Sequence, residues 1–560
     1  MVNSGVKMWE SVLKFCIGVV LIILANVLAS KYIFRIDLTE EKRFSITEAS
    51  KDLLRNLDDA VYIDIYLEGD LPAPLKKLKK AARERLDEFK IYASNNIQYN
   101  FIDPSKASSA RAREEFYKSL EEKGLQRTRL FDNADGAKVE KIIFPGAIVS
   151  YGGREKPVAL LRGQGGLSAI NESIEGLEYE FVSTIRGLTN DDKKSIGLIK
   201  GHNEADSLEL TGLTNTLLET YHVFNVNLPR KQALEGYDAV IIAKPKKAFS
   251  EQDKYKLDQY IMRGGKVLFF VDMLAVNIDS ALNSSTYALP IDLNLDDQLF
   301  KYGIRINRDY VQDLTAGNVP VVVGMIGDQP QIQGFKWPFF PMINRYADHP
   351  IVKNIDATYA KFINSMDTVK AEGILKTPLM FSSQYSRKLG SPLRVSLSDL
   401  RGIKQEDFYN QNPIALAYLL EGSFTSLYKN RFLPKGVDKG SFREQGVPTK
   451  LLIVPDGDFV RNEFSLKNGQ PLDLGIDELT RQKFANDDFI KNALQYMLDD
   501  DGIITAKSKE IKIRPLDKIK IQEERLFWQV TNLALPVVLV VLYGFLRFFL
   551  RKRRFTNFKS

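Results

Sequence analysis

Two long apolar stretches, one near each end of the chain, constrain the fold more than any other feature of the sequence. The first covers about residues 12–34 and carries no charge between Phe15 and Ser30, and the second covers residues 526–546 without a charge. At about 1.5 Å per helical residue, such stretches can cross a hydrocarbon core roughly 30 Å thick. We therefore predict two transmembrane helices, within residues 1–35 and 516–560, that flank a large soluble region.

The first stretch has a second interpretation, because Val27-Leu28-Ala29 is an acceptable cleavage site for a signal peptide. Apolar character resumes directly afterwards, at residues 32–34, and this favours a retained helix. Basic residues follow the second stretch, from Arg547 to Arg554, and the positive-inside rule then predicts a cytoplasmic C-terminus. Two spans return the N-terminus to the cytoplasm, so the body would lie in the periplasm, anchored to the bacterial inner membrane.

The composition excludes several classes of protein. Hydrophobic residues make up 44% and charged residues 27% of the chain, and the mean hydropathy of −0.21 is too low for a protein of many spans. Much of the net charge of +7 comes from the basic C-terminal tail, so we predict no nucleic-acid partner. Cys16 is the one cysteine and lies in the first apolar stretch, which rules out an internal disulfide and a cysteine-based zinc site.

Residues 36–190 predict a first α/β domain. Alternation in residues 61–67 predicts a strand, apolar residues at steps of three and four predict a helix over 75–93, and a second strand follows at 97–102. This βαβ unit predicts a parallel strand pair. The remaining predicted elements are a charged helix at 110–123, a hairpin of strands 147–151 and 157–161, and an amphipathic helix at 170–188.

Residues 191–515 predict a second, doubly wound α/β domain. Short apolar strands alternate with amphipathic helices, which is typical of a parallel sheet covered on both faces. The predicted strands are residues 196–199, 223–228, 239–243, 266–271 and 451–454, and the predicted helices are 208–220, 250–263 and 487–498. A large insertion, at about 275–445, interrupts this pattern and would have its own short elements. Residues 511–521, alternating Ile and Lys, lead to the second apolar stretch.

Polar side chains follow several predicted strands, and open α/β sheets bind ligands at the carboxyl ends of their strands. They are His202, Glu204, Lys244, Asp272 and Asp456. A histidine with carboxylates could bind a metal or act as acid and base, but the spacing matches no defined ligand motif. The sequence also lacks a nucleophile elbow, a dinucleotide motif and an ATP-binding loop. We predict no enzymatic activity, no cofactor and no metal; these residues either contact a ligand or cap the next helix.

The insertion contains a dense aromatic-proline run, Trp337-Pro338-Phe339-Phe340-Pro341. Aromatic side chains of this kind can stack on a sugar, form a protein interface or fill a small core. Trp337 is therefore a further candidate ligand-binding residue, together with His202, Glu204, Asp272 and Asp456.

Several segments taken together resemble the GldG family, the gliding-motility-associated auxiliary (substrate-binding) subunits of an ABC transporter. They are residues 37–47, the Gly201-His202-Asn203-Glu204 turn, residues 296–313 with Tyr302-Gly303-Ile304, and the basic-flanked final span. The resemblance covers essentially the whole chain, and the order of its elements is its most specific part. It implies a glutamine-amidotransferase-like α/β domain without that fold's catalytic cysteine, a multi-span permease partner, a separate cytoplasmic ATPase, and a role in gliding motility.

The sequence is consistent with three functional hypotheses. The leading hypothesis is a non-catalytic periplasmic subunit of an ABC-type transporter complex. A tethered receptor for a saccharide or peptide would need a cleft lined by Trp337, Phe339 or the strand-end carboxylates. A tethered hydrolase would need His202, Glu204, Asp272 or Asp456 to converge within hydrogen-bond reach.

Overall fold

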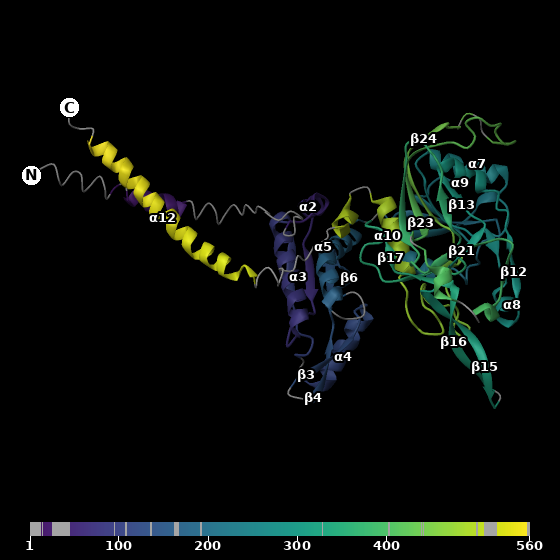
Figure 1. Ribbon diagram of the computed structural model, residues 1–560, viewed down its shortest axis with the longest axis horizontal. Helices are drawn as coiled ribbons and strands as arrows, with labels where there is room; N and C mark the ends of the chain where they lie inside the picture. Colours follow the sequence, from purple (N-terminus) through teal and green to yellow (C-terminus); the bar gives the residue numbers. More distant parts are fainter. Residues whose placement is uncertain are drawn as a thin grey trace, which may run out of the picture. The chain divides into compact units, whose positions relative to one another are not determined.

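The computed structural model describes residues 13, 15–24, 45–94, 96–106, 109–134, 137–161, 167–190, 193–327, 329–400, 404–410, 412–437, 440, 442–499, 502–508 and 523–556. The chain divides into two compact units, residues 1–509 and 510–560, and each is described by itself. The first unit contains two α/β bodies, and the second contains the long helix α12, Arg525–Thr556 (Figure 1).

The N-terminal body is built on a four-stranded sheet of order β2-β1-β5-β6. Its strands are β1 (Val61–Ile65), β2 (Ile97–Phe101), β5 (Gly146–Tyr151) and β6 (Arg154–Ala159). The β1–β2 pair is parallel, as the βαβ pattern predicts, whereas β5 pairs antiparallel with both β1 and β6. A separate hairpin of β3 (Thr128–Ala134) and β4 (Ala137–Ile143) was not predicted from the sequence.

The α-helices of this body, among the residues described, are α2 (Glu48–Arg55), α3 (Ala73–Tyr92), α4 (Ala110–Glu122) and α5 (Leu167–Thr189). Helix α3 has proline in its first turn, where the missing N–H costs nothing. Its apolar stripe, from Leu75 to Phe89, is buried with α5 and the sheet in one hydrophobic cluster. Lys76, Lys77 and Lys80 on its other face are exposed, which is typical of a solvated face.

The second body contains an eight-stranded sheet of order β17-β20-β23-β24-β10-β9-β7-β8. Five strands run parallel: β7 (Ser195–Lys200), β8 (His222–Asn227), β9 (Ala239–Ala243), β10 (Lys266–Phe270) and β24 (Gln445–Val454). The three strands at one side run antiparallel: β17 (Arg345–Tyr346), β20 (Ile374–Phe381) and β23 (Ala415–Thr425).

Alternating side chains of the parallel strands enter two separate hydrophobic clusters, one on each face of the sheet. Leu198 of β7 lies in the cluster that includes α6 (Thr211–Leu218) and α10 (Asn486–Leu498). The next residue, Ile199, lies in the cluster that includes α7 (Glu251–Met262) and α9 (Asp296–Tyr302). The period of two in a strand produces this division. The sheet is therefore covered by helices on both faces, as expected of a doubly wound domain.

The insertion is less independent than the sequence suggests, because its strands β17, β20 and β23 extend the central sheet. The reason is that β23 pairs with β24, so that the insertion leaves and rejoins one sheet. The rest of the insertion has its own cluster around Trp337 and a long hairpin of β15 (Ala316–Ile326) and β16 (Gln329–Ile343) (Figure 1). Its other elements are β11 (Leu274–Ala275), α8 (Ile278–Asn283), β12 (Thr286–Pro290), β13 (Ile304–Ile306), β14 (Asp309–Asp313), β18 (Thr358–Tyr359), β19 (Met366–Thr368), β21 (Ser386–Gly390) and β22 (Leu393–Val395).

Of the described residues, one helix, Arg525–Arg553, is long and apolar enough to cross a membrane, with a mean hydropathy of 2.3. Pro536 of the second apolar stretch lies inside it. The described part of the first stretch is a shorter apolar helix, Phe15–Leu24. The rest of that stretch and the Ile-Lys segment 511–521 lie outside the described residues.

Candidate functional site

The strand order places a topological switch point between β7 and β9. The chain leaves β7 toward β8 on one side and later continues from β9 toward β10 on the other, so the connections diverge at this point. Ligands of open α/β sheets bind in the crevice outside the carboxyl ends of the strands at such a point. His202 follows β7 and Lys244 follows β9, so the predicted residues lie at the expected edge of the sheet.

His202 is held between two carboxylates. Its Nδ1 lies 3.2 Å from Oε1 of Glu204 and its Nε2 lies 3.3 Å from Oδ2 of Asp253, while its ring stacks on Phe249 with centroids 3.7 Å apart. Burial lowers the pKa of His202, but the hydrogen bonds to Asp253 and Glu204 raise it more, so the net pKa is raised. His202 is 3% exposed, and the geometry stabilises its imidazolium.

Glu204 stabilises the turn that contains it. Its Oε2 accepts the backbone N–H groups of Gly201 and His202, each at 2.9 Å. Burial raises the pKa of Glu204, but the His202 side chain and the backbone N–H groups of Glu204 and His202 outweigh burial and lower it. Gly201 is required at this position because its φ is +126° and an added Cβ would lie 2.4 Å from Pro229. The backbone N–H groups of this turn, at the end of β7, are therefore hydrogen-bonded within the turn itself.

Lys244 begins a second group of charges, across β9, β10 and β24. Its φ is 54°, an uncommon value for a residue other than glycine, and its ammonium lies 3.0 Å from Oδ2 of Asp272 and also contacts Asp458. Burial lowers the pKa of Lys244, but the two carboxylates raise it more. Asp458 in turn contacts Arg461, and Arg461 contacts Glu209. The group therefore alternates cations and anions.

Asp456 and Asp272 stabilise the loop after β24 by accepting backbone N–H groups. Asp456 accepts from Lys361 at 2.7 Å and from Asp458 at 2.8 Å, and Asp272 accepts from Gly457 at 2.7 Å. Burial raises the pKa of both carboxyls, and it raises that of Asp456 well above the ordinary value. An added Cβ at Gly457 would lie 2.7 Å from Cβ of Lys244, so only glycine leaves room for this arrangement.

Trp337 lies in the core of the insertion. It is 1% exposed and packs against Phe339, Phe340 and Phe362, with ring centroids 5.1 to 5.7 Å apart. A ligand could touch this indole only if the insertion opened. Phe340, by contrast, borders a cleft of about 340 Å³ that Lys361, Asp458 and Arg461 also line.

The predicted residues therefore form two groups and one isolated position. His202 and Glu204 join Asp253; Asp272 and Asp456 join Lys244 and Asp458; Trp337 joins neither. In the part of the chain that the structure describes, no set of three or more His, Cys, Asp or Glu side chains is arranged to hold a metal ion. The charged side chains face one another and the backbone, so the arrangement is suited to fixing the strand ends in place.

Sequence reasoning missed Arg461, Glu209, Lys361 and Asp253 as members of these groups. Arg461 lies three residues after Asp458, a spacing that could have indicated an ion pair. Asp253 lies in the first turn of α7, where its carboxylate accepts a hydrogen bond from the hydroxyl of Ser250 at 2.7 Å. Lys361 lies in an irregular segment of the insertion, where no pattern in the sequence indicates its neighbours.

The fold and the site together define an α/β protein with a candidate C-terminal membrane helix. Charged side chains lie at the carboxyl ends of its parallel strands, where they pair with one another and with the backbone. A family model described as "ABC-type uncharacterized transport system" matches residues 193–493, more than half of the chain. The chain belongs to this family of ABC transporter auxiliary proteins. The prediction of an auxiliary subunit is confirmed at this level, and the family indicates an accessory, non-enzymatic role. A second model, a domain of unknown function, matches residues 40–150.

Two further comparisons found similar proteins. An uncharacterized protein of Borreliella burgdorferi is 20% identical to this chain, covering 97% of this chain and 99% of its own length. Among solved structures, the mmIFT52 N-terminal domain is 12% identical, with a TM-score of 0.30, over 54% of this chain and 97% of that one. A score this low carries no argument about fold or function.

Proposed function

We propose that the chain is a non-catalytic accessory subunit of an ABC-type transporter, anchored in the inner membrane at both ends with its body in the periplasm. Its partners would be a multi-span permease and, through the permease, a cytoplasmic ATPase. The proposed role in gliding motility rests on the resemblance to the GldG family. The main structural support is helix α5, because the segments that lead from both terminal apolar stretches pack against it.

The segment that follows the first apolar stretch is fixed to α5 by a buried carboxylate. Oε1 of Glu178 accepts the backbone N–H of Thr47 at 2.6 Å and the hydroxyl of Ser50 at 2.8 Å. Arg85 lies 3.7 Å from the other oxygen of Glu178, and Glu88 accepts the N–H of Ile46 at 2.9 Å. These are charge-assisted hydrogen bonds in a buried site, where they are strongest. The start of the body is therefore firmly attached to α5.

The segment before the second apolar stretch attaches to the same helix. The short helix η5, Ile503–Ser508, places Ile503, Ile504 and Ala506 in the hydrophobic cluster of the N-terminal body. The ammonium of Lys507 lies 5.4 Å from the ring centre of Tyr179 on α5. Ile503, Ile504 and Ala506 therefore pack with the first body, although the predicted second domain extends to residue 515.

Helix α5 also contacts the second body. Arg186 lies 2.8 Å from Asp499 at the end of α10, and the hydroxyl of Tyr179 donates to Gln495 of α10. Asp499 also accepts the N–H of Ile504 at 2.8 Å. A displacement of either membrane-linked segment would therefore reach the second body through one helix. We infer that the chain transmits conformational change between a permease and its periplasmic body.

Purification of the intact chain from membranes in mild detergent tests this proposal. We expect a multi-span permease and an ATPase to co-elute in stoichiometric amounts. A folded chain that elutes alone would contradict the proposal. It would favour instead a tethered saccharide or peptide receptor, for which the cleft beside Phe340 is the candidate site. Titration of the purified chain with oligosaccharides and peptides would then measure that binding.

A further inference from the structure

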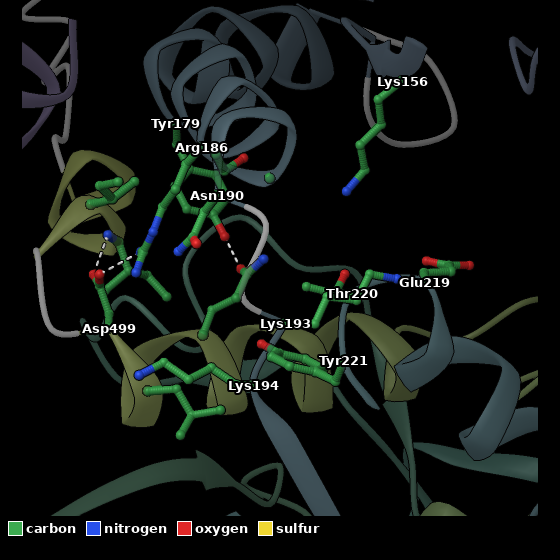
Figure 2. A pocket seen from close by; sticks show the side chains of 16 residues that line it. Lys156, Tyr179, Arg186, Asn190, Lys193, Lys194, Glu219, Thr220, Tyr221 and Asp499 are labelled. Carbon is green, nitrogen blue, oxygen red and sulfur yellow. Dashed lines mark hydrogen bonds and ion pairs between the residues drawn. The ribbon is translucent and has the colours of Figure 1, made fainter. Parts of the chain in front are cut away.

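A cavity of about 140 Å³ lies where α5, the end of α10, η5 and the start of β7 meet. Its walls carry Tyr179 and Arg186 from α5, Asn190 after it, Thr220 and Tyr221 before β8, and Asp499 after α10 (Figure 2). Apolar side chains of Leu498, Ile503 and Ile504 complete the lining. A cavity of about 150 Å³ holds a molecule the size of benzene, so this one suits a small ligand.

Lys156 of β6 is directed into this cavity (Figure 2). Its ammonium lies over Gly187 of α5, at 3.4 Å from the position that a Cβ there would occupy. Among the described residues, no hydrogen bond or ion pair reaches this half-buried ammonium; the acidic Glu219 on the cavity wall pairs with Lys491 at 3.0 Å. Burial lowers the pKa of Lys156, and Glu219 offsets this only in part. A half-buried cation without a counter-ion is stabilised by an anion.

The charge of the cavity wall indicates which anion. Among the residues that the structure describes, four basic side chains line it, Lys156, Arg186, Lys193 and Lys194, against two acidic ones, Glu219 and Asp499, which gives these residues a net charge of +2. A phosphate group carries about −1.5 to −2 at pH 7 and three strong acceptor oxygens, whereas one carboxylate carries −1. The hydroxyl group of Thr220 in the wall can donate a hydrogen bond to such an oxygen, whereas the hydroxyl of Ser183 donates to the backbone carbonyl of Glu180 at 3.3 Å.

We propose that this cavity binds the phosphate group of a small molecule, with Lys156 as its principal counter-charge. The phosphate could belong to a free small molecule or to a lipid headgroup, and the two sources share the chemistry that the cavity recognises. The site lies where the two bodies and the segment toward α12 meet, so an anion bound there would strengthen that junction.

Calorimetric titration of the full chain in detergent micelles with inorganic phosphate, at pH 7 and constant ionic strength, tests this site. We expect Lys156→Gln to weaken binding at least about tenfold, which corresponds to about 1.4 kcal/mol. Lys156→Arg keeps the charge and should retain binding to within about threefold, a difference of less than 1 kcal/mol. Lys118→Gln, an exposed lysine on α4, is the matched control and should bind as the wild type does.

Equal phosphate affinity in the wild type and in Lys156→Gln would overturn the proposal. The absence of binding up to about 10 mM phosphate would also overturn it, because a specific phosphate site should have a Kd well below that concentration. Melting temperatures of all variants show whether a loss of binding reflects unfolding. Replacing phosphate by dihexanoyl phosphatidic acid separates the two sources, since tighter binding of that lipid assigns the site to a headgroup. None of these outcomes depends on whether a permease co-purifies.

Discussion

The strand-end groups of the second body and the cavity beside α5 both contain buried or half-buried charges. The two regions differ in whether those charges have partners. At the strand ends Lys244 contacts Asp272 and Asp458, and the backbone N–H groups of the same loops satisfy the remaining oxygens. In the cavity, Lys156 has no such partner among the described residues. A saturated network stabilises a fold, whereas an unsaturated cation is suited to a ligand. The position expected from the fold class is therefore less suited to a ligand than the junction between the bodies.

The largest effect is expected from Lys244→Met. This change leaves the buried carboxylates of Asp272 and Asp458 without their shared cation, and removal of one partner from a buried ion pair costs about 3–5 kcal/mol. We expect the melting temperature of the chain to fall by roughly 10 °C, at about 2–4 °C per kcal/mol for domains of this size. Lys246→Met, at an exposed neighbouring position, is the control. A wild-type melting temperature for Lys244→Met would mean that the strand-end network is not structural.

A smaller and more local effect is expected from Glu178→Ala. It removes the acceptor of the Thr47 N–H and the Ser50 hydroxyl and leaves Arg85 with less negative charge beside it, at a cost of about 1.5–3 kcal/mol. Hydrogen exchange should accelerate at least about tenfold in α2, because local opening is then easier. The control is Glu172→Ala, at an exposed position of α5, the helix that also carries Glu178. This change should leave hydrogen exchange in α2 unchanged. Protection of α2 that survives Glu178→Ala would show that this attachment to α5 is not needed.

The pH dependence of stability tests whether the His202 charge at the strand ends is paired with Glu204 and Asp253. The pKa of His202 is raised in the folded chain, so its stabilisation is complete below the ordinary value of about 6.5 and is lost as the pH rises through the raised pKa. Glu204 and Asp253 have lowered pKa values and stay charged over this range. The melting temperature of His202→Gln should therefore differ most from that of the wild type near pH 6. The difference should shrink by about pH 9, and a constant difference would mean that the imidazole is not charged.

The smallest effect is expected from Gly187→Ala, and its two consequences have opposite signs. Gly187 lies in the last turn of α5, where alanine has a higher helix propensity than glycine by up to about 1 kcal/mol, so the melting temperature should rise slightly. The new methyl group would lie 3.4 Å from the ammonium of Lys156 and restrict the cavity. We expect phosphate to bind roughly two- to fivefold more weakly, a change of less than about 1 kcal/mol. Unchanged affinity would indicate that phosphate binds away from α5.

Local elements of this protein could be predicted from the sequence because their signals are local. Strand β9 has the predicted bounds, and the Ser250 cap of α7 accepts the Asp253 N–H as its spacing indicates. Helix α2 was missed because it is short and mostly polar; its stability depends on Glu178, which is distant in the sequence. Pairing of β23 with β24 was missed because a strand's partner is not encoded in its own pattern.

The candidate sites show the same limit. The strand-end positions of His202 and Asp272 could be predicted, since the end of each strand is visible in the sequence. Whether their charges would be satisfied could not be, because Asp253 and Lys244 approach them from other connections. The cavity could not be predicted at all, since Lys156, Arg186 and Asp499 come from three separate elements of two bodies.

The placement of β24 beside β10 has a consequence for how the chain acquires its structure. Val267 pairs with Leu451, so β10 has no neighbour on that side until the whole insertion has been synthesised. Pairing between such distant segments makes folding slow, and an unpaired strand edge can associate with other chains in the meantime. A nascent chain interrupted before residue 445 would expose this edge. We therefore expect fragments that end within the insertion to aggregate, while the N-terminal sheet, whose strands lie close together in the sequence, has formed early.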